Sequence, residues 1–177
     1  MRQGRGVRTA LLAAVLASLL LPARGEQPAA DEWLAFEGTW SATGERQTLV
    51  LDEGREAAIV RMSGPLVLTS GKGLPRGFLT ETIGFADGRG HSIGAAVWTD
   101  DRGDKIFSDV TGGPIQTGRR LSGAVRGGTG RYAGLTGEWT LDWQFVIQGE
   151  GDTFQARSVN AKVRIRFGRA PAGEAPR

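Results

Sequence analysis

The feature that most constrains this chain is an alternation of apolar and polar side chains with a period of two. It is clearest near the C-terminus, where an apolar set alternates with a polar set: Val159, Ala161, Val163, Ile165 and Phe167 against Asn160, Lys162, Arg164 and Arg166. Because successive side chains of a strand point to opposite faces, this pattern predicts a half-buried β-strand over 159–167. The basic stripe is then the solvent face of that strand.

The same period recurs along most of the chain. A second clear case is Trp139, Leu141, Trp143, Phe145 and Ile147 against Glu138, Thr140, Asp142, Gln144 and Val146. Further strands are predicted over 36–43, 46–52, 56–69 (with a break at Gly64-Pro65 left open), 77–86, 91–100, 105–111 and 119–126. No stretch after residue 25 shows a helical period over three turns, so the expected fold class is all-β, with no substantial helix after residue 25.

Turn-forming residues separate these strands. The predicted turns are Thr43-Gly44-Glu45, Asp52-Glu53-Gly54, Asp87-Gly88-Arg89-Gly90, Asp101-Arg102-Gly103-Asp104 and Gln116-Thr117-Gly118. Short strands joined by Gly-rich turns indicate a sandwich or a barrel. Sequential hairpins without long crossovers favour a single closed antiparallel β-barrel of about eight strands, because closure removes exposed strand edges.

The N-terminus has the three parts of a secretion signal. Arg2, Arg5 and Arg8 form a positive start, Thr9 to Leu21 is an uncharged run of 13 residues, and small residues follow up to Gly25. This order predicts a signal peptide over 1–25, cleaved at or within a residue or two of Gly25. The run is short for a transmembrane helix, which needs about 20 apolar residues. An uncleaved anchor is the alternative; otherwise export to the periplasm or medium is expected, with no stable membrane insertion after cleavage.

The basic character of the whole chain comes largely from this segment. The chain has 22 Lys and Arg against 19 Asp and Glu, and four of the basic residues lie within the first 25 positions. The remaining 152 residues therefore carry 18 basic and 19 acidic groups. Nucleic-acid binding, which usually needs a basic footprint, is not expected. These residues suffice for one domain: a polar leader over 26–32, the β-barrel over 33–168 and a disordered tail rich in Pro and Ala over 169–177.

A glycine-rich segment joins two of the predicted strands: Gly127-Gly128-Thr129-Gly130-Arg131-Tyr132-Ala133-Gly134-Leu135-Thr136-Gly137. A dinucleotide-binding loop would require a following helix, whereas strands follow here, so nucleotide binding is not expected. The simpler interpretation is a tight connection in which Tyr132 and Leu135 fold back and plug one end of the barrel.

This segment resembles the glycine motif of the allene oxide cyclase barrel-like and dirigent-like proteins. The upstream stretch 98–107, Trp-Thr-Asp-Asp-Arg-Gly-Asp-Lys-Ile-Phe, is similar to a turn and strand in small secreted bacterial relatives. The resemblance implies an eight-stranded antiparallel barrel with an apolar cavity, in which plant members guide cyclisation or radical coupling of a hydrophobic molecule. It assigns no catalytic residue here. Separately, Gly38-Thr39-Trp40 resembles the first-strand Gly-x-Trp of lipocalin-like and avidin-like barrels.

One acidic residue is a candidate for chemistry inside the barrel. If Leu79, Glu81, Ile83 and Phe85 form the inward face of their strand, Glu81 is a buried carboxylate that could act as a general acid or base. Arg61 is a possible inward partner. Two alternatives stay open: a buried ion pair, or the opposite strand phase, which places Glu81 in water.

Aromatic residues are the candidates for ligand binding. Trp139 and Trp143 share one strand face and Trp98 ends another strand, so the three could line a small-molecule cavity or simply fill the core. His91, the only histidine, is expected in an exposed turn, and Asp100, Asp101 and Asp104 in a solvated hairpin turn. The chain has no cysteine, and neither a metal nor a cofactor is expected.

Two functions are consistent with these features. The first is an exported barrel that binds, and could cyclise or isomerise, a small hydrophobic molecule in its cavity. The second is a non-catalytic structural or interaction module that engages a partner protein. Cavity volume distinguishes them, because pockets for small molecules usually exceed about 300 Å³.

Overall fold

The computed structural model describes residues 32–52, 54–113, 120–149 and 151–168. These residues form nine strands and one turn of 3-10 helix, η1 (Gly130–Tyr132). The strands are β1 (Leu34–Asp52), β2 (Arg55–Leu68), β3 (Gly77–Ala86), β4 (Ser92–Thr99), β5 (Lys105–Gly112), β6 (Arg120–Gly128), β7 (Leu135–Asp142), β8 (Gln144–Gln148) and β9 (Thr153–Phe167). The described part of the chain contains no helix long and apolar enough to span a bilayer.

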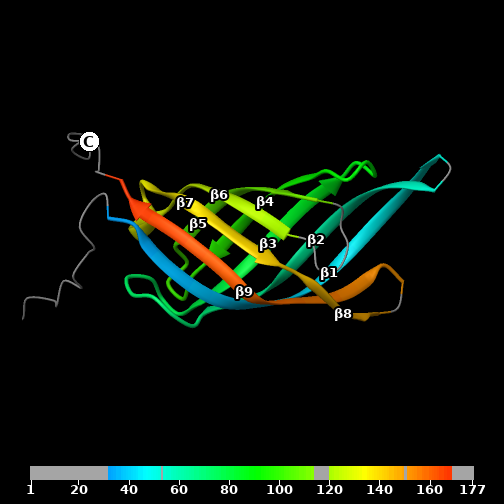
Figure 1. The fold of residues 1–177 in the computed structure, drawn as a ribbon. Helices are drawn as coiled ribbons and strands as arrows, with labels where there is room; N and C mark the ends of the chain where they lie inside the picture. The colour runs from blue at the N-terminus through cyan, green and yellow to red at the C-terminus, as the bar shows by residue number, and fades with distance from the viewer. Residues whose placement is uncertain (1–31, 53, 114–119, 150, 169–177) are drawn as a thin grey trace, which may run out of the picture.

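The strands close into a barrel (Figure 1). Each strand from β1 to β6 pairs antiparallel with the next, β7 pairs with β9, and β9 pairs with β1. β7 and β8 pair with successive halves of β9, so they occupy one position around the barrel. The result is the predicted closed antiparallel barrel with eight strand positions. The barrel follows from the predicted alternation of apolar and polar side chains, because the apolar face of each strand lines the interior.

The first strand is longer than the sequence pattern predicts. Thr43-Gly44-Glu45 was expected to turn, but β1 runs straight through it, with Gly44 paired to Met62 on one side and Phe154 on the other. A Cβ at Gly44 would lie 2.5 Å from the ring of Phe154. The glycine is therefore required by packing inside the barrel, and not by a turn. β2 likewise continues through Gly64-Pro65 without a break.

The last strand starts earlier than predicted and changes phase within its length. The β1–β9 register shifts between Gly38 and Trp40. Opposite this shift, Ser158 is buried, whereas Val159 is 68% exposed. The prediction that Val159 shares the buried face of Ala161 is therefore wrong, because a β-bulge inserts a residue and reverses the alternation. The remaining alternation up to Phe167 is as predicted. Ile147, predicted to share the face of Trp139, is also exposed.

The glycine-rich connection plugs one end of the barrel, as predicted. β6 ends at Gly128, η1 follows, and β7 begins at Leu135. Tyr132 and Leu135 are 1% and 0% exposed, and the ring of Tyr132 lies 6.1 Å from that of Phe78. The connections between β3 and β4 and between β4 and β5 also lie at the predicted Asp-Gly turns.

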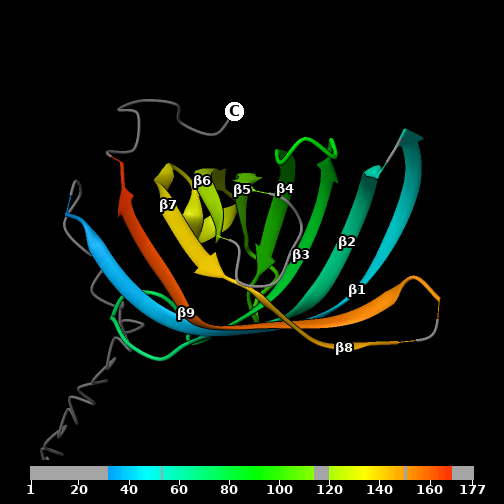
Figure 2. The same ribbon diagram turned by 45° about the vertical axis from the view of Figure 1, so that its right-hand side comes forward.

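The other end of the barrel carries two hairpins that diverge from each other. Figure 2 shows the tip of the β1–β2 hairpin and the tip of the β8–β9 hairpin extending in different directions. The predicted signal peptide, the residues before Glu32 in the leader, the turn at 116–118 and the C-terminal tail lie outside the described residues.

Candidate functional site

Three tryptophans meet in the middle of the barrel. Trp40 from β1, Trp98 from β4 and Trp139 from β7 are 4–6% exposed. The rings of Trp98 and Trp139 lie 5.9 Å apart, within the usual range for aromatic pairs. Of the three tryptophans predicted as cavity-lining residues, Trp98 and Trp139 are thus brought together. The third, Trp143, is also buried, but its ring packs against Phe154 at 6.3 Å.

The indole nitrogens of two of these residues have partners within the barrel wall. Nε1 of Trp40 donates a hydrogen bond of 2.9 Å to the hydroxyl of Thr80, which itself donates to the backbone oxygen of Gly64 at 2.8 Å. Nε1 of Trp139 donates to the hydroxyl of Ser108 at 3.1 Å. Buried donors of this kind must be paired to avoid a desolvation penalty. These bonds fix the orientation of both indoles.

The tryptophans leave little space between them. A cavity of about 30 Å³ lies in contact with Trp40, Trp98, Trp139, Met62 and Leu141, among others. A volume of this size suits about one water molecule, whereas ligand pockets range over about 300–1,000 Å³. No titratable side chain lines this cavity in the part of the chain that the structure describes. The space around the tryptophans is therefore a packed core rather than a ligand pocket.

The predicted inward orientation of Glu81 is wrong. Leu79, Ile83 and Phe85 are 45–55% exposed and Glu81 is exposed with them, whereas Phe78 and Thr80 of the same strand are each 3% exposed. The opposite phase of β3 is therefore the correct one. Beyond Phe78 it places the small residues Thr80, Thr82 and Gly84 inward, which leaves interior volume for Trp40 and Trp98.

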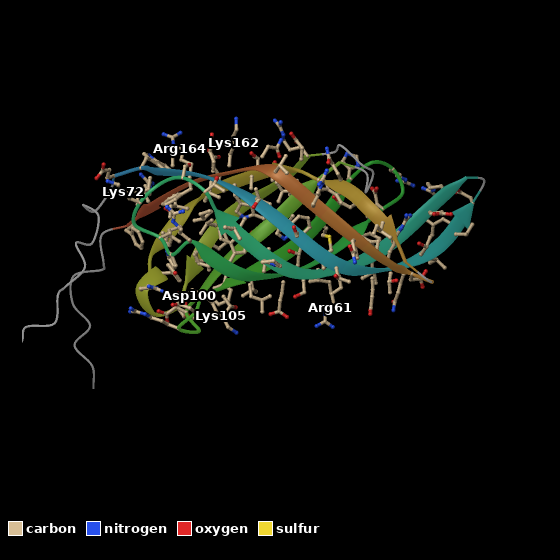
Figure 3. All side chains as sticks on the ribbon, turned by 90° about the horizontal axis from the view of Figure 1, so that it is seen from below. Arg61, Lys72, Asp100, Lys105, Lys162 and Arg164 are labelled. Atoms are coloured by element: carbon tan, nitrogen blue, oxygen red, sulfur yellow. The ribbon has the colours of Figure 1, made fainter. Side chains whose placement is uncertain are left out.

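Arg61, the predicted partner of Glu81, also lies on the outer surface. It is exposed, and it pairs across the sheet with Ile83 rather than with Glu81. Figure 3 shows its side chain extending away from the barrel, on the side opposite to Lys162 and Arg164. His91 is in an exposed turn, as predicted, with 82% of its side chain accessible.

Sequence reasoning missed a buried polar cluster at the plugged end. The side chain of Asp100 is fully buried, and its Oδ2 accepts hydrogen bonds from the Tyr132 hydroxyl at 2.7 Å and from Nε and Nη2 of Arg131 at 2.8 and 2.5 Å. Its Oδ1 accepts from the backbone amides of Arg102 and Asp104. The expectation of a fully solvated turn is therefore wrong for Asp100, but it holds for Asp101, whose side chain is 78% exposed.

The electrostatics of this cluster follow from its contacts. Burial raises the pKa of Asp100, but the hydrogen bonds from Tyr132, Arg131 and the two backbone amides outweigh burial and lower its pKa to about 2. Burial and the bond to Asp100 raise the pKa of Tyr132. The alternation of side chains could have predicted the burial of Asp100. Trp98 points inward, so Asp100, two residues later, points the same way. Every oxygen of Asp100 is occupied, so the cluster acts as a structural lock.

A much larger space than the tryptophan cavity lies on the outside of the barrel. A shallow groove of about 600 Å³ crosses β2 to β5, and its apolar wall is formed by Ile59, Ile83, Phe85 and Ile93. We call these four side chains the outer apolar groove. They are 45–64% exposed, which is unusual for a contiguous set of large apolar side chains.

Comparison with known proteins gives a likeness of fold at low identity. No protein-family model matches the chain, and neither does any curated protein. Among solved structures, the pterocarpan synthase dirigent protein is similar, with a TM-score of 0.46 and 10% identity over 78% of this chain and 89% of that protein. This likeness transfers no ligand, reaction or residue role to the present chain.

Proposed function

We propose that this chain is a non-catalytic binding barrel that engages a partner protein through the outer apolar groove. The observation that carries the proposal is the location of accessible apolar surface. The cavity among the tryptophans holds about 30 Å³ of space, whereas the groove outside offers about 600 Å³. Exposed contiguous apolar surface on a folded domain usually marks an interaction site.

The strand register explains how the groove forms. Ile59, Phe85 and Ile93 lie directly opposite one another across β2, β3 and β4, so their side chains make one continuous row. Ile83 lies in the next row, opposite Ala95, whose small side chain leaves the groove open on that side. A shallow surface of this shape fits a protein face better than a small molecule, which is normally buried over most of its surface.

Charges at the border define the chemistry of the partner. Arg61 flanks Ile83, and Glu81 lies two residues before it; neither makes an ion pair with another residue in the described ranges. Asp109, on the far border, is paired with Arg126 at 2.6 Å. The complementary surface is therefore apolar, with an acidic group facing Arg61 and a basic group facing Glu81, because charge complementarity fixes orientation at the border of an interface.

The test uses a photo-crosslinking amino acid at Phe85 in the cells that make this protein. The matched position is Thr136, which is exposed on the outer face of β7, four strand positions away. We expect one discrete crosslinked protein from Phe85, lost with Ile83→Asp and weakened at least tenfold by Arg61→Glu. Equal crosslinking from both positions, or a product insensitive to Ile83→Asp, would exclude the groove as the binding face.

A second candidate is binding of a small apolar molecule inside the barrel. The observation in its favour is that the inward side chains Thr82 and Leu121 are partly exposed, and both border the tryptophan cavity. A ligand would have to displace neighbouring side chains, since the present space suits one water. Native mass spectrometry of the protein from its own compartment tests this: an added small-molecule mass supports it, and the bare chain mass contradicts it.

We also propose that the chain is exported. The support is the order of charged, apolar and small residues over 1–25. The mass of the mature protein tests the proposal. A mature N-terminus near residue 26 supports it, and an intact Met1 on protein from the cytoplasm contradicts it.

A further inference from the structure

At the tip of the barrel, one edge of β1 pairs with no other strand in the described part of the chain. Its pairing with β9 ends at Glu45, opposite Thr153, and the Arg46 amide donates to the oxygen of Asp152 at 2.8 Å. Beyond Arg46, β1 continues to Asp52 with β2 on one side only. On the other side no strand among the described residues pairs with it, and Figure 2 shows the β8–β9 hairpin diverging there.

The backbone groups on this edge have a defined direction. N–H and C=O of one residue point to the same side of a strand, and the next residue points to the opposite side. Because the Arg46 amide faces β9, the amides and carbonyls of Thr48 and Val50 face the open edge. Those of Gln47 and Leu49 face β2. An open edge of this kind is a template for another extended strand.

The side chains on this edge lack the usual protection. Leu49, Val50 and Leu51 are 64%, 68% and 43% exposed, and no charged residue occurs between Arg46 and Asp52. Strand edges of monomeric proteins are commonly protected by lysine, proline or a bulge at such positions. Here the bulge comes only after Val50, at the very end of the strand.

We propose that this edge pairs with the same edge of a second copy of the chain, antiparallel about a two-fold axis at Leu49. In that register Thr48 of each copy lies opposite Val50 of the other, and the two exchange both backbone hydrogen bonds. Leu49 lies opposite Leu49, and Gln47 opposite Leu51. A two-fold contact requires a self-complementary surface, which this register supplies.

Charge at the ends of the segment favours this occupant. The antiparallel register brings the end that carries Arg46 in one copy near the end that carries Asp52 in the other, and backbone pairing stops at Gln47 because the Arg46 amide already donates to Asp152. Within each copy Arg46 also binds Glu56 and Asp52 binds Arg55, so the unlike charges add attraction at the border rather than new ion pairs. Directly opposed like charges would destabilise such a pair. The edge shares no residue with the outer apolar groove, although Gln47 pairs with Ile59 of the groove. The proposal does not depend on the proposed function, and the tests of the two use different residues.

The register is tested by disulfide trapping. Because the chain has no native cysteine, an introduced cysteine can form a disulfide only with the same cysteine of a second copy. In the proposed dimer the two Leu49 residues form a non-hydrogen-bonded pair with Cα atoms about 4.5 Å apart, close enough for a disulfide. The two Leu51 residues are about 13 Å apart along the strands and cannot be bridged. Under mild oxidation of the full-length chain, we expect a covalent dimer from Leu49→Cys and none from Leu51→Cys.

Charge substitution tests the contact without a covalent bond. Leu49→Lys and Leu49→Glu each place like charges opposite each other, so we expect the dimer dissociation constant in sedimentation to rise at least tenfold. Mixing the two variants should restore a heterodimer. Val159→Lys, at an equally exposed position on β9, is the control and should leave association unchanged. A monomer at all concentrations, no Leu49→Cys dimer, or a dimer insensitive to Leu49→Lys would overturn the proposal.

Discussion

The hydroxyl of Tyr132 donates a hydrogen bond of 2.7 Å to Oδ2 of Asp100, and this contact joins the glycine-rich connection to the β4–β5 turn. The two residues are 32 positions apart in the sequence and lie together at the plugged end of the barrel. The same carboxylate binds Arg131, so one buried acid holds two consecutive residues of η1. The first two predictions concern this lock.

Asp100→Asn should destabilise the protein by about 2 kcal/mol, because it removes the charge that Arg131 and Tyr132 both bind. The expected result is a lower midpoint in urea unfolding followed by fluorescence. Asp101→Asn is the matched control: Asp101 contacts the same guanidinium at 3.2 Å, but its side chain is 78% exposed. If both variants unfold at the same midpoint, the buried carboxylate is not a lock.

Stability should fall in acid because of the same group. The pKa of Asp100 is lowered in the folded state, from 3.8 to about 2. Its contribution is therefore fully present above pH 4 and is lost as the pH falls through about 2, with a total of roughly 2 kcal/mol. Urea midpoints measured between pH 5 and pH 2 test this. Asp100→Asn should flatten the decline; an unchanged slope would assign it to other carboxylates.

Gly123→Ala should disturb the centre of the barrel. Gly123 lies opposite Trp139, and a Cβ there would lie 2.0 Å from Cε2 of the indole. The ring must move, which costs about 1–3 kcal/mol by overpacking, and the bond to Ser108 is lost with it. Near-UV circular dichroism and urea unfolding report both effects. Gly77→Ala, where nothing lies within 4 Å of the new Cβ, should behave as the wild type.

Adjacent substitutions on β3 test its phase. Thr80→Val removes the acceptor of the Trp40 indole and leaves that buried N–H unpaired, so we expect a loss of about 1–3 kcal/mol. Glu81→Gln, one residue later on the outer face, should leave the urea midpoint unchanged. The reverse result, with Glu81→Gln destabilising and Thr80→Val neutral, would restore the inward orientation of Glu81.

The strands themselves were predictable because each has to bury one face. The bounds of β3 are those predicted from alternation, and the Asp-Gly turns on either side of β4 fall at the expected positions. The plug at Tyr132 and Leu135 was also predictable, because the glycine-rich stretch permits a tight connection that returns two apolar side chains to the core.

The phase of individual strands was not predictable from alternation alone. Both faces of β3 carry apolar residues, and the larger set, which includes Ile83 and Phe85, is the exposed one. The barrel interior is already occupied by Trp40, Trp98 and Trp139, so it accepts Thr80 and Gly84 at this level but not a second layer of large side chains. The volume available inside the barrel depends on the side chains of all the strands, so the sequence of one strand does not reveal which of its faces will fit.

The sequence by itself determined that this chain forms an antiparallel barrel, because its alternation, turns and glycines are local properties that act within a few residues. Closure of the barrel determined the orientation and packing of the individual side chains. It turned Glu81 and Arg61 outward, packed the tryptophans until about 30 Å³ remained between them, and buried Asp100 beneath Tyr132. It also left the edge of β1 beyond Arg46 without a partner strand among the described residues. Each of these outcomes depends on which strands meet around the ring, and that is a property of the whole chain.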